Sequence, residues 1–111
     1  MAHLPSLVET HLAAAQQDAH GRSAELVVHD GVLRQTVLAL RSGTELAEHN
    51  SPHAASIQVL AGRVRVTGMS PEELGVGEAV ALTHDRHSVR ALDDAVFLLT
   101  TVTSQPGDLR D

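Results

Sequence analysis

The spacing of hydrophobic and polar residues divides the chain into a short helical region and a longer β-like region. In the first region apolar residues recur at the spacing of one helix face, at Leu7, Val8, Leu12 and Ala15. Ser6 and Glu9 have the spacing of a capping box, and Gly21 is a common type of helix terminator. We therefore predict a helix over residues 6–20. Its apolar stripe is narrow and rich in alanine, so we expect it to pack on a larger unit.

From residue 24 onward, short apolar runs are separated by turn residues such as glycine, aspartate and proline. The predicted strands cover residues 24–28, 32–40, 55–60, 63–67, 79–83, 87–92 and 95–102. These runs, with no second helical stretch, predict an antiparallel β-sandwich or barrel. We expect Val64 and Val66 to face inward, because they alternate with arginines. The unbroken apolar run over residues 95–99 predicts a strand that is covered on both faces.

The chain has 111 residues, of which 42% are hydrophobic and 20% are charged, the balance of a single globular domain. We expect residues 1–23 to carry the packed helix, residues 24–103 to form the barrel and residues 104–111 to form a tail. No apolar run approaches the roughly 20 residues of a membrane helix, and the first residues lack a secretory signal pattern. These features predict a cytoplasmic protein without membrane contact.

Composition excludes several kinds of chemistry. The chain carries 8 basic and 14 acidic side chains, so no basic face is available for nucleic acid. It has no cysteine, which excludes thiolate zinc sites and cysteine nucleophiles, and every basic residue is an arginine, which excludes Schiff-base chemistry. Phe97 is the only Phe, Tyr or Trp residue. We therefore expect a small polar or aliphatic ligand, because rings for stacking are scarce.

Eight histidines in so short a chain make a bound metal the first chemistry to consider. Two groups are local in sequence, His49-Asn50-Ser51-Pro52-His53 and His84-Asp85-Arg86-His87. Pro52 excludes a helical zinc motif in the first group, whereas in an extended segment positions 49, 51 and 53 share one face. Two such strands facing each other would bring three imidazoles to one divalent transition metal ion. His11 and His20, on the predicted helix, are expected to be exposed or half-buried.

Glycine and histidine spacings in the second half of the chain form two motifs in order. Gly43 is followed after five residues by His49, and Gly62 closes this first motif. The second motif begins at Gly77, which is followed by a glutamate, and ends at His87. In this order and at this separation, the two motifs resemble those of a small single-domain cupin of the RmlC-like type.

The resemblance covers residues 42–102 and implies an all-β fold. This fold is an antiparallel double-stranded β-helix, or cupin/jelly-roll barrel, and we place the one N-terminal α-helix outside it. The resemblance also implies a homodimer, for which we expect two-fold symmetry. Of the family's usual metal ligands only His49 and His87 align, because Ser51 and Ala55 stand at the other two positions.

His53 is the candidate for a third ligand. The predicted metal site is therefore His49, His53 and His87, holding one divalent ion such as Zn, Fe, Mn or Ni. The candidate ligand-binding residues are Ser51, Gln58, His84 and Arg86. Gln58 has the opposite parity to Ile57 and Val59, so it faces away from the barrel interior unless the strand bulges.

Two functions remain open at this point. The first is a protein that binds a small molecule in the barrel interior, with or without a divalent metal. The alternative is a metal-dependent enzyme of dioxygenase, isomerase or decarboxylase type that uses His49, His53 and His87. The missing ligands and the lack of an evident general base favour the binding function, because a fold alone does not establish an activity.

Overall fold

The computed structural model describes residues 1–49, 54–82 and 87–103, which form one helix and nine strands. The helix α1 spans Leu4–Gln17. The strands are β1 (Arg22–Asp30), β2 (Leu33–Leu40), β3 (Glu45–His49), β4 (Ala54–Ala61), β5 (Arg63–Val66), β6 (Glu73–Gly75), β7 (Ala79–Leu82), β8 (His87–Ala91) and β9 (Ala95–Val102). Every strand that the sequence predicts is confirmed to within a few residues at each end.

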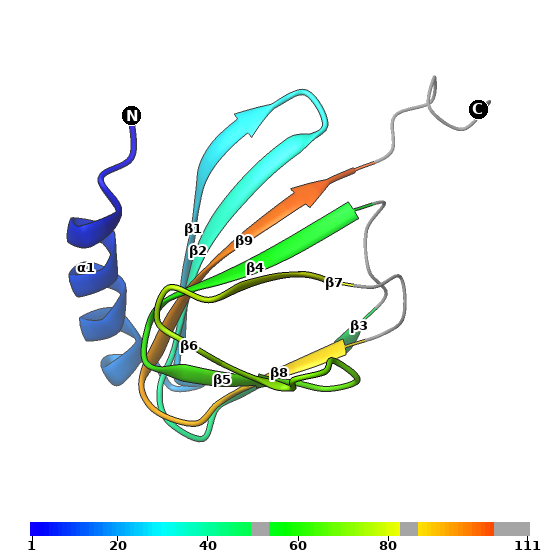
Figure 1. The fold of residues 1–111 in the computed structure, drawn as a ribbon. Helices are drawn as coiled ribbons and strands as arrows, with labels where there is room; N and C mark the ends of the chain where they lie inside the picture. Colours follow the sequence, from blue (N-terminus) through cyan, green and yellow to red (C-terminus); the bar gives the residue numbers. More distant parts are fainter. Residues whose placement is uncertain (50–53, 83–86, 104–111) are drawn as a thin grey trace.

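Two antiparallel sheets face each other, and the helix lies outside them (Figure 1). The large sheet has the strand order β1-β2-β9-β4-β7, and the small sheet has the order β3-β8-β5-β6. The barrel is not closed. The predicted fold class is confirmed: the protein is all-β, with two antiparallel sheets and a single N-terminal helix within the described residues.

The main core fills the space between the two sheets. Its most deeply buried members are Leu40, Ile57, Val59, Val64, Val66, Ala91, Ala95 and Phe97. On β5 the valines are buried and the arginines beside them are exposed, which confirms the predicted alternation. The arrangement follows from the two-residue period of a strand, which sends successive side chains to opposite faces of the sheet.

Strand β9 is covered on both faces, as its unbroken apolar run predicts. It lies in the middle of the large sheet between β2 and β4. Ala95 and Phe97 belong to the core between the sheets, whereas Val96 belongs to a second apolar cluster on the opposite face, next to α1. The first three residues of β9 are buried, which explains why apolar residues stand at consecutive positions there.

Helix α1 packs on the outer face of the large sheet over β1, β2 and β9. Its buried Ala15 meets Val37, Ala39 and Val96, and Leu4, Leu7, Val8 and Leu12 pack around this cluster. The expectation that the helix packs on a larger unit is therefore confirmed. Within the described ranges no helix combines the length and the apolar character needed to cross a membrane.

The predicted ends of the helix were wrong by two or three residues. The helix begins at Leu4 because His3 is the N-cap, and its ring accepts a hydrogen bond from the Ser6 backbone N–H at 3.3 Å. The helix ends at Gln17 because Asp18 takes an extended backbone conformation. The Asp18 carboxylate accepts hydrogen bonds from the backbone N–H groups of Arg22 and His20, which lower its pKa below the ordinary value. These bonds turn the chain from the helix into β1.

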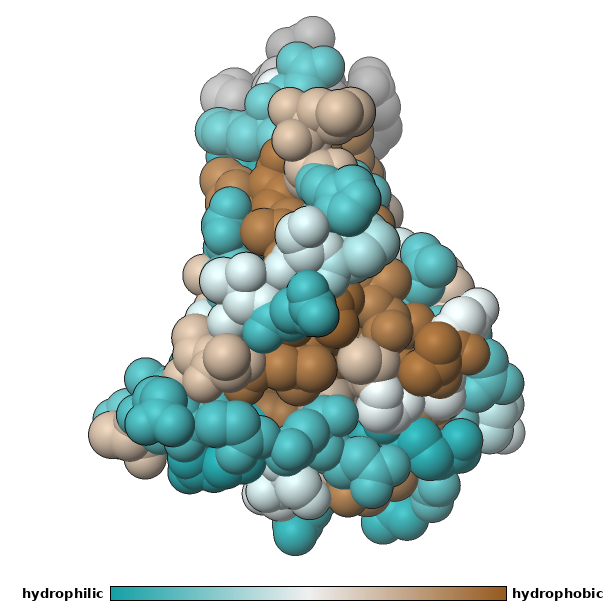
Figure 2. Space-filling model, turned by 90° about the vertical axis from the view of Figure 1, so that its left-hand side faces the viewer, coloured by the Kyte–Doolittle hydropathy of each residue, from teal (hydrophilic) through white to brown (hydrophobic). Residues whose placement is uncertain are grey.

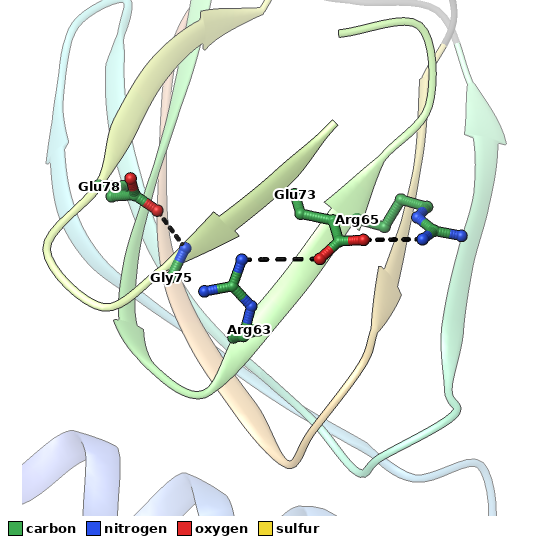
Figure 3. Close-up of polar contacts among 5 residues, drawn as sticks. All are labelled: Arg63, Arg65, Glu73, Gly75 and Glu78. Atoms are coloured by element: carbon green, nitrogen blue, oxygen red, sulfur yellow. Dashed lines mark hydrogen bonds and ion pairs between the residues drawn. The ribbon is translucent and has the colours of Figure 1, made fainter. Parts of the chain in front are cut away.

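Strands β3 and β6 are absent from the predicted set, although the segment around His49 was expected to be extended. Strand β6 has only three residues, and polar contacts help to hold it against β5. Figure 3 shows the Glu73 carboxylate between the two arginines of β5. One carboxylate oxygen lies 2.8 Å from a guanidinium nitrogen of Arg65, and the other lies 3.6 Å from a guanidinium nitrogen of Arg63. In the following turn, the Glu78 carboxylate accepts a hydrogen bond from the Gly75 N–H at 2.6 Å. Such contacts across the sheet leave no periodic pattern in the sequence.

Candidate ligand cavity

A cavity of about 210 Å³ lies between the two sheets. It is lined by Leu38, Leu46, Ala55, Ile57, Leu82, His87, Val89, Phe97, Leu99 and Thr101. These residues come from β2, β3, β4, β7, β8 and β9, so both sheets contribute to the wall. Apart from His87 and Thr101, every lining residue within the described part of the chain is apolar.

The cavity occupies one end of the space between the sheets, which we name the cavity end. It is marked by Leu38, Leu46, Leu82, Leu99 and Thr101, which are only partly buried. The opposite end, which we name the packed end, contains Leu40, Val59, Val64, Ala91 and Ala95. These side chains are at most 1% exposed, and none of them lines the cavity. Inward-facing side chains therefore fill the space between the sheets at the packed end and leave a cavity at the other end.

His87 is an ionisable residue on the cavity wall. It is the first residue of β8 and is only 6% exposed. Its Nδ1 lies 2.6 Å from the backbone carbonyl oxygen of Thr67. Because a carbonyl oxygen can only accept, Nδ1 carries the proton and donates, and the neutral ring has its acceptor lone pair on Nε2. This hydrogen bond to Thr67 therefore fixes the orientation of the ring on the cavity wall.

Thr67 and Ser88 fix the position of this histidine. The Thr67 hydroxyl accepts a hydrogen bond from the Ser88 N–H at 2.9 Å and lies 3.2 Å from the Ser88 hydroxyl. The Thr67 N–H donates in turn to the Ser88 carbonyl at 3.1 Å. Gly68 follows with a φ of +79°, and a Cβ at this residue would lie 3.6 Å from the His87 Nδ1. The segment after β5 thus holds the imidazole from one side.

The strand register brings the two histidine positions of the predicted site together. Strand β3 pairs with β8, and the Cα partner of His87 in this ladder is His49. A bulge or irregularity lies between Leu46 and His49. The other predicted residues of this region, Ser51, His53, His84 and Arg86, lie outside the described residues. Their roles, and the three-histidine metal site as a whole, stay predictions.

Gln58 points away from the cavity and Thr101 lines it, because successive side chains along a strand alternate between the two faces of the sheet. Gln58 is exposed, on the face of β4 opposite to the buried Ile57, and it is not a lining residue of the cavity. The expected outward orientation is therefore confirmed. Thr101 lines the cavity although it was not among the candidates. It stands two residues after Leu99 and four after Phe97 on β9, so the same parity rule could have found it.

The described residues alone do not supply a full set of metal ligands. No group of three or more His, Asp or Glu side chains within the described ranges could hold an ion. Among the described residues, His87 is the one of these types on the cavity wall, and His49 is its partner in the strand ladder. A catalytic zinc or iron site normally has three protein ligands. The described residues alone therefore supply fewer ligands than such a site needs, and His53, the third predicted ligand, lies outside them.

A second polar cluster lies beneath α1. The prediction that His11 is exposed or half-buried was wrong, because it is only 7% exposed. Its Nδ1 is 2.7 Å from the Ser23 hydroxyl, and its Nε2 is 2.9 Å from the Glu25 carboxylate. The order of serine, histidine and carboxylate is that of a hydrolytic triad, but neither Ser23 nor His11 lines the interior cavity. Ser23 and Glu25 instead provide hydrogen-bond partners for the buried imidazole, and these contacts link the helix to β1.

Comparison with known proteins gives a likeness of structure. No protein-family model matches the sequence, and no curated protein matches it. A solved RmlC-like cupin from Shewanella frigidimarina is 16% identical, with a TM-score of 0.69 over 80% of this chain and 82% of that one. KdgF from Halomonas sp. is 21% identical, with a TM-score of 0.67 over 82% of this chain and 87% of that one.

A larger enzyme also contains a similar unit. The salicylate 1,2-dioxygenase from Pseudaminobacter salicylatoxidans is 21% identical, with a TM-score of 0.72. The match covers 87% of this chain and 33% of that chain. These solved proteins share the arrangement of strands with this chain, and identities at this level concern the fold alone.

Proposed function

Because the chain has the cupin fold, we propose that its interior cavity binds a small, mainly apolar molecule that carries one polar group. The observation that carries this proposal is a mostly apolar cavity of about 210 Å³ with one buried, oriented imidazole on its wall. The side chains of His87 and Thr101 would contact the polar group of the ligand, and the remaining wall would contact its apolar part. Ligand sites in proteins commonly have this composition.

The size of the cavity limits the ligand. Pockets for drug-sized molecules are roughly 300–1,000 Å³. A space of about 210 Å³ therefore suits a smaller molecule. We expected a non-aromatic ligand because the chain has few aromatic side chains for stacking. Its one phenyl ring, that of Phe97, nevertheless lies on the cavity wall. Aliphatic and aromatic probes are both needed for this reason.

The proposal is tested with three probes: 1-hexanol, hexanoate and benzyl alcohol. Ligand-observed NMR measures the binding of each to the full chain and to the His87→Ala variant. We expect at least one probe to bind the wild type and to bind His87→Ala at least about fivefold more weakly, the loss of one hydrogen bond. A circular dichroism melting curve checks that the variant is folded. Binding that is equal in both proteins, or absent from the wild type, would contradict the proposal.

A second candidate is a metal-dependent enzyme of dioxygenase, isomerase or decarboxylase type that uses His49, His53 and His87. Two observations favour it: His49 stands opposite His87 in the β3–β8 ladder, and the fold is shared with a dioxygenase. A bound metal would supply Lewis-acid or redox chemistry at the cavity, while His87 would be held ready by Thr67.

Metal analysis separates the two candidates. The protein is purified without a histidine tag, and the wild type is compared with His49→Ala and His87→Ala. Close to one transition metal ion per chain in the wild type, lost in both variants, would support the enzyme. Metal-free protein whose stability is unchanged by a chelator would remove the enzyme and leave the binding function.

A further inference from the structure

The inner face of the large sheet carries an arginine beside the cavity. Arg34 is the second residue of β2, and its Cα partner in the ladder with β9 is Thr101, which lines the cavity. Leu38 and Leu40 on β2 face the space between the sheets, and Arg34 has the same parity. Side chains that stand directly opposite each other in such a ladder have Cβ atoms about 4.5–5.5 Å apart. Arg34 is therefore the neighbour of a polar residue of the cavity wall.

Arg34 lies on the face of the sheet that is turned away from helix α1. The helix packs on the outer face, over β1, β2 and β9. Figure 2 views the molecule from this helix side and shows apolar surface there between polar side chains. Figure 1 shows that the hairpin between β1 and β2 and the end of β9 extend past the strands of the small sheet. Arg34 therefore stands at the rim of the interior, beyond the closely packed core.

The positive charge of Arg34 is not matched by a carboxylate among the described residues. Its side chain is half-buried and forms no ion pair with any of them. The guanidinium donates one hydrogen bond from Nη1 to the Thr103 hydroxyl at 2.8 Å, and it has five N–H donors in all. The two neighbours of Arg34 across the sheet are Thr101 and His29, and neither is acidic. A partly buried charge of this kind is stabilised by an anionic partner.

We propose that the ligand of the interior cavity carries a carboxylate, which accepts hydrogen bonds from the Arg34 guanidinium and the Thr101 hydroxyl. The apolar part of the ligand then lies against the apolar wall. This inference rests on the proposed binding function and adds the chemical class of the ligand. A guanidinium suits a carboxylate because two parallel N–H groups can reach its two oxygens. The described residues of the cavity wall include no acidic side chain that would repel such a ligand.

The test compares hexanoate with 1-hexanol, which have the same number of carbons and differ in the polar group. Ligand-observed NMR at neutral pH gives the dissociation constants for the full-length wild type and for Arg34→Gln. We expect the wild type to bind hexanoate at least about fivefold more tightly than 1-hexanol. Arg34→Gln should weaken hexanoate by at least about tenfold and change 1-hexanol by less than about twofold. Glutamine keeps a donor for Thr103 and removes only the charge.

Arg90→Gln is the matched control. Arg90 is exposed on β8, beside Val89, which lines the cavity, and its parity places it on the opposite face of the small sheet. The variant removes the same charge outside the cavity, so both probes should bind it as they bind the wild type. Melting curves check that each variant is folded. Should Arg34→Gln not fold, Arg34→Met, which keeps an unbranched side chain, takes its place.

The outcomes separate this inference from the proposed function. Binding of 1-hexanol without a preference for hexanoate would overturn the carboxylate and leave the binding function standing. Equal losses for both probes in Arg34→Gln would also overturn it, because they would show a change in packing. So would a loss for hexanoate in Arg90→Gln as large as that in Arg34→Gln. Failure of hexanoate, 1-hexanol and benzyl alcohol to bind the wild type would contradict the binding function itself, and the carboxylate with it.

Discussion

The packed end and the cavity end of the interior are built from the same strands but differ in what fills them. At the packed end, aliphatic side chains such as Leu40, Val59 and Val64 close completely on one another. At the cavity end, side chains are partly buried, and a polar imidazole lies on the wall. Burying an imidazole costs free energy that an aliphatic side chain would not cost. This difference is the one expected if the packed end provides stability and the cavity end holds the proposed ligand.

The largest expected effect comes from shortening a leucine at the packed end. Leu40→Ala removes a fully buried side chain and should lower the free energy of unfolding by about 2–5 kcal/mol. Leu82→Ala at the cavity end is the matched change, and it should cost less than half as much because Leu82 is only partly buried beside existing space. Urea denaturation measures both values. Equal losses would show that the two ends do not differ in packing.

A smaller difference is expected between two glycines with positive φ. At the packed end, a Cβ on Gly62 would lie 2.3 Å from the Asp94 carbonyl oxygen, so Gly62→Ala meets both a clash and backbone strain. At the cavity end, Gly68→Ala meets ordinary contacts and carries only the strain, about 1–2 kcal/mol. Thermal melting should therefore place Gly62→Ala below Gly68→Ala. The reverse order would contradict the close approach of the chain at the packed end.

The smallest effect is expected on the outer face of the small sheet. The hydrogen bond from Arg65 lowers the pKa of Glu73, so this pair adds stability above the ordinary carboxyl pKa and loses it as the pH falls through the lowered value. Because both side chains are exposed, Glu73→Gln should change the melting temperature far less than Gly68→Ala at neutral pH. The small difference should disappear in acid. A large drop in melting temperature at neutral pH would contradict the expectation that this exposed ion pair adds little stability.

The sequence predicted much of the fold because the period of the pattern is itself the physical cause of burial. The alternation around Val64 and the unbroken run of β9 needed no further information. The helix start was missed because His3 is not a usual cap residue, and its ring takes that role only once Ser6 is in position. Strand β6 was missed because contacts from Arg63 and Arg65 across the sheet hold it in place.

The same reasoning predicted only part of the candidate site. Parity correctly placed Gln58 outside, and the spacing of histidines selected His87, which lies on the cavity wall. His87 is oriented by the hydrogen bond that its Nδ1–H donates to the Thr67 carbonyl, twenty residues away in sequence, and no local pattern indicates this bond. Burial of His11 likewise depends on Ser23 and Glu25 on a different element. Such contacts follow from the packing of elements, which a one-dimensional pattern does not specify.

Filling the cavity tests most directly whether the cavity end is a binding site. Ala55 faces the cavity, and its neighbour Ala54 is exposed on the opposite face of β4, so Ala55→Leu and Ala54→Leu add the same atoms inside and outside. The measurement is the dissociation constant of whichever of 1-hexanol, hexanoate and benzyl alcohol binds the wild type most tightly. We predict wild-type affinity for Ala54→Leu and a loss of at least about tenfold for Ala55→Leu. Equal affinities in the two folded variants would contradict binding in the interior.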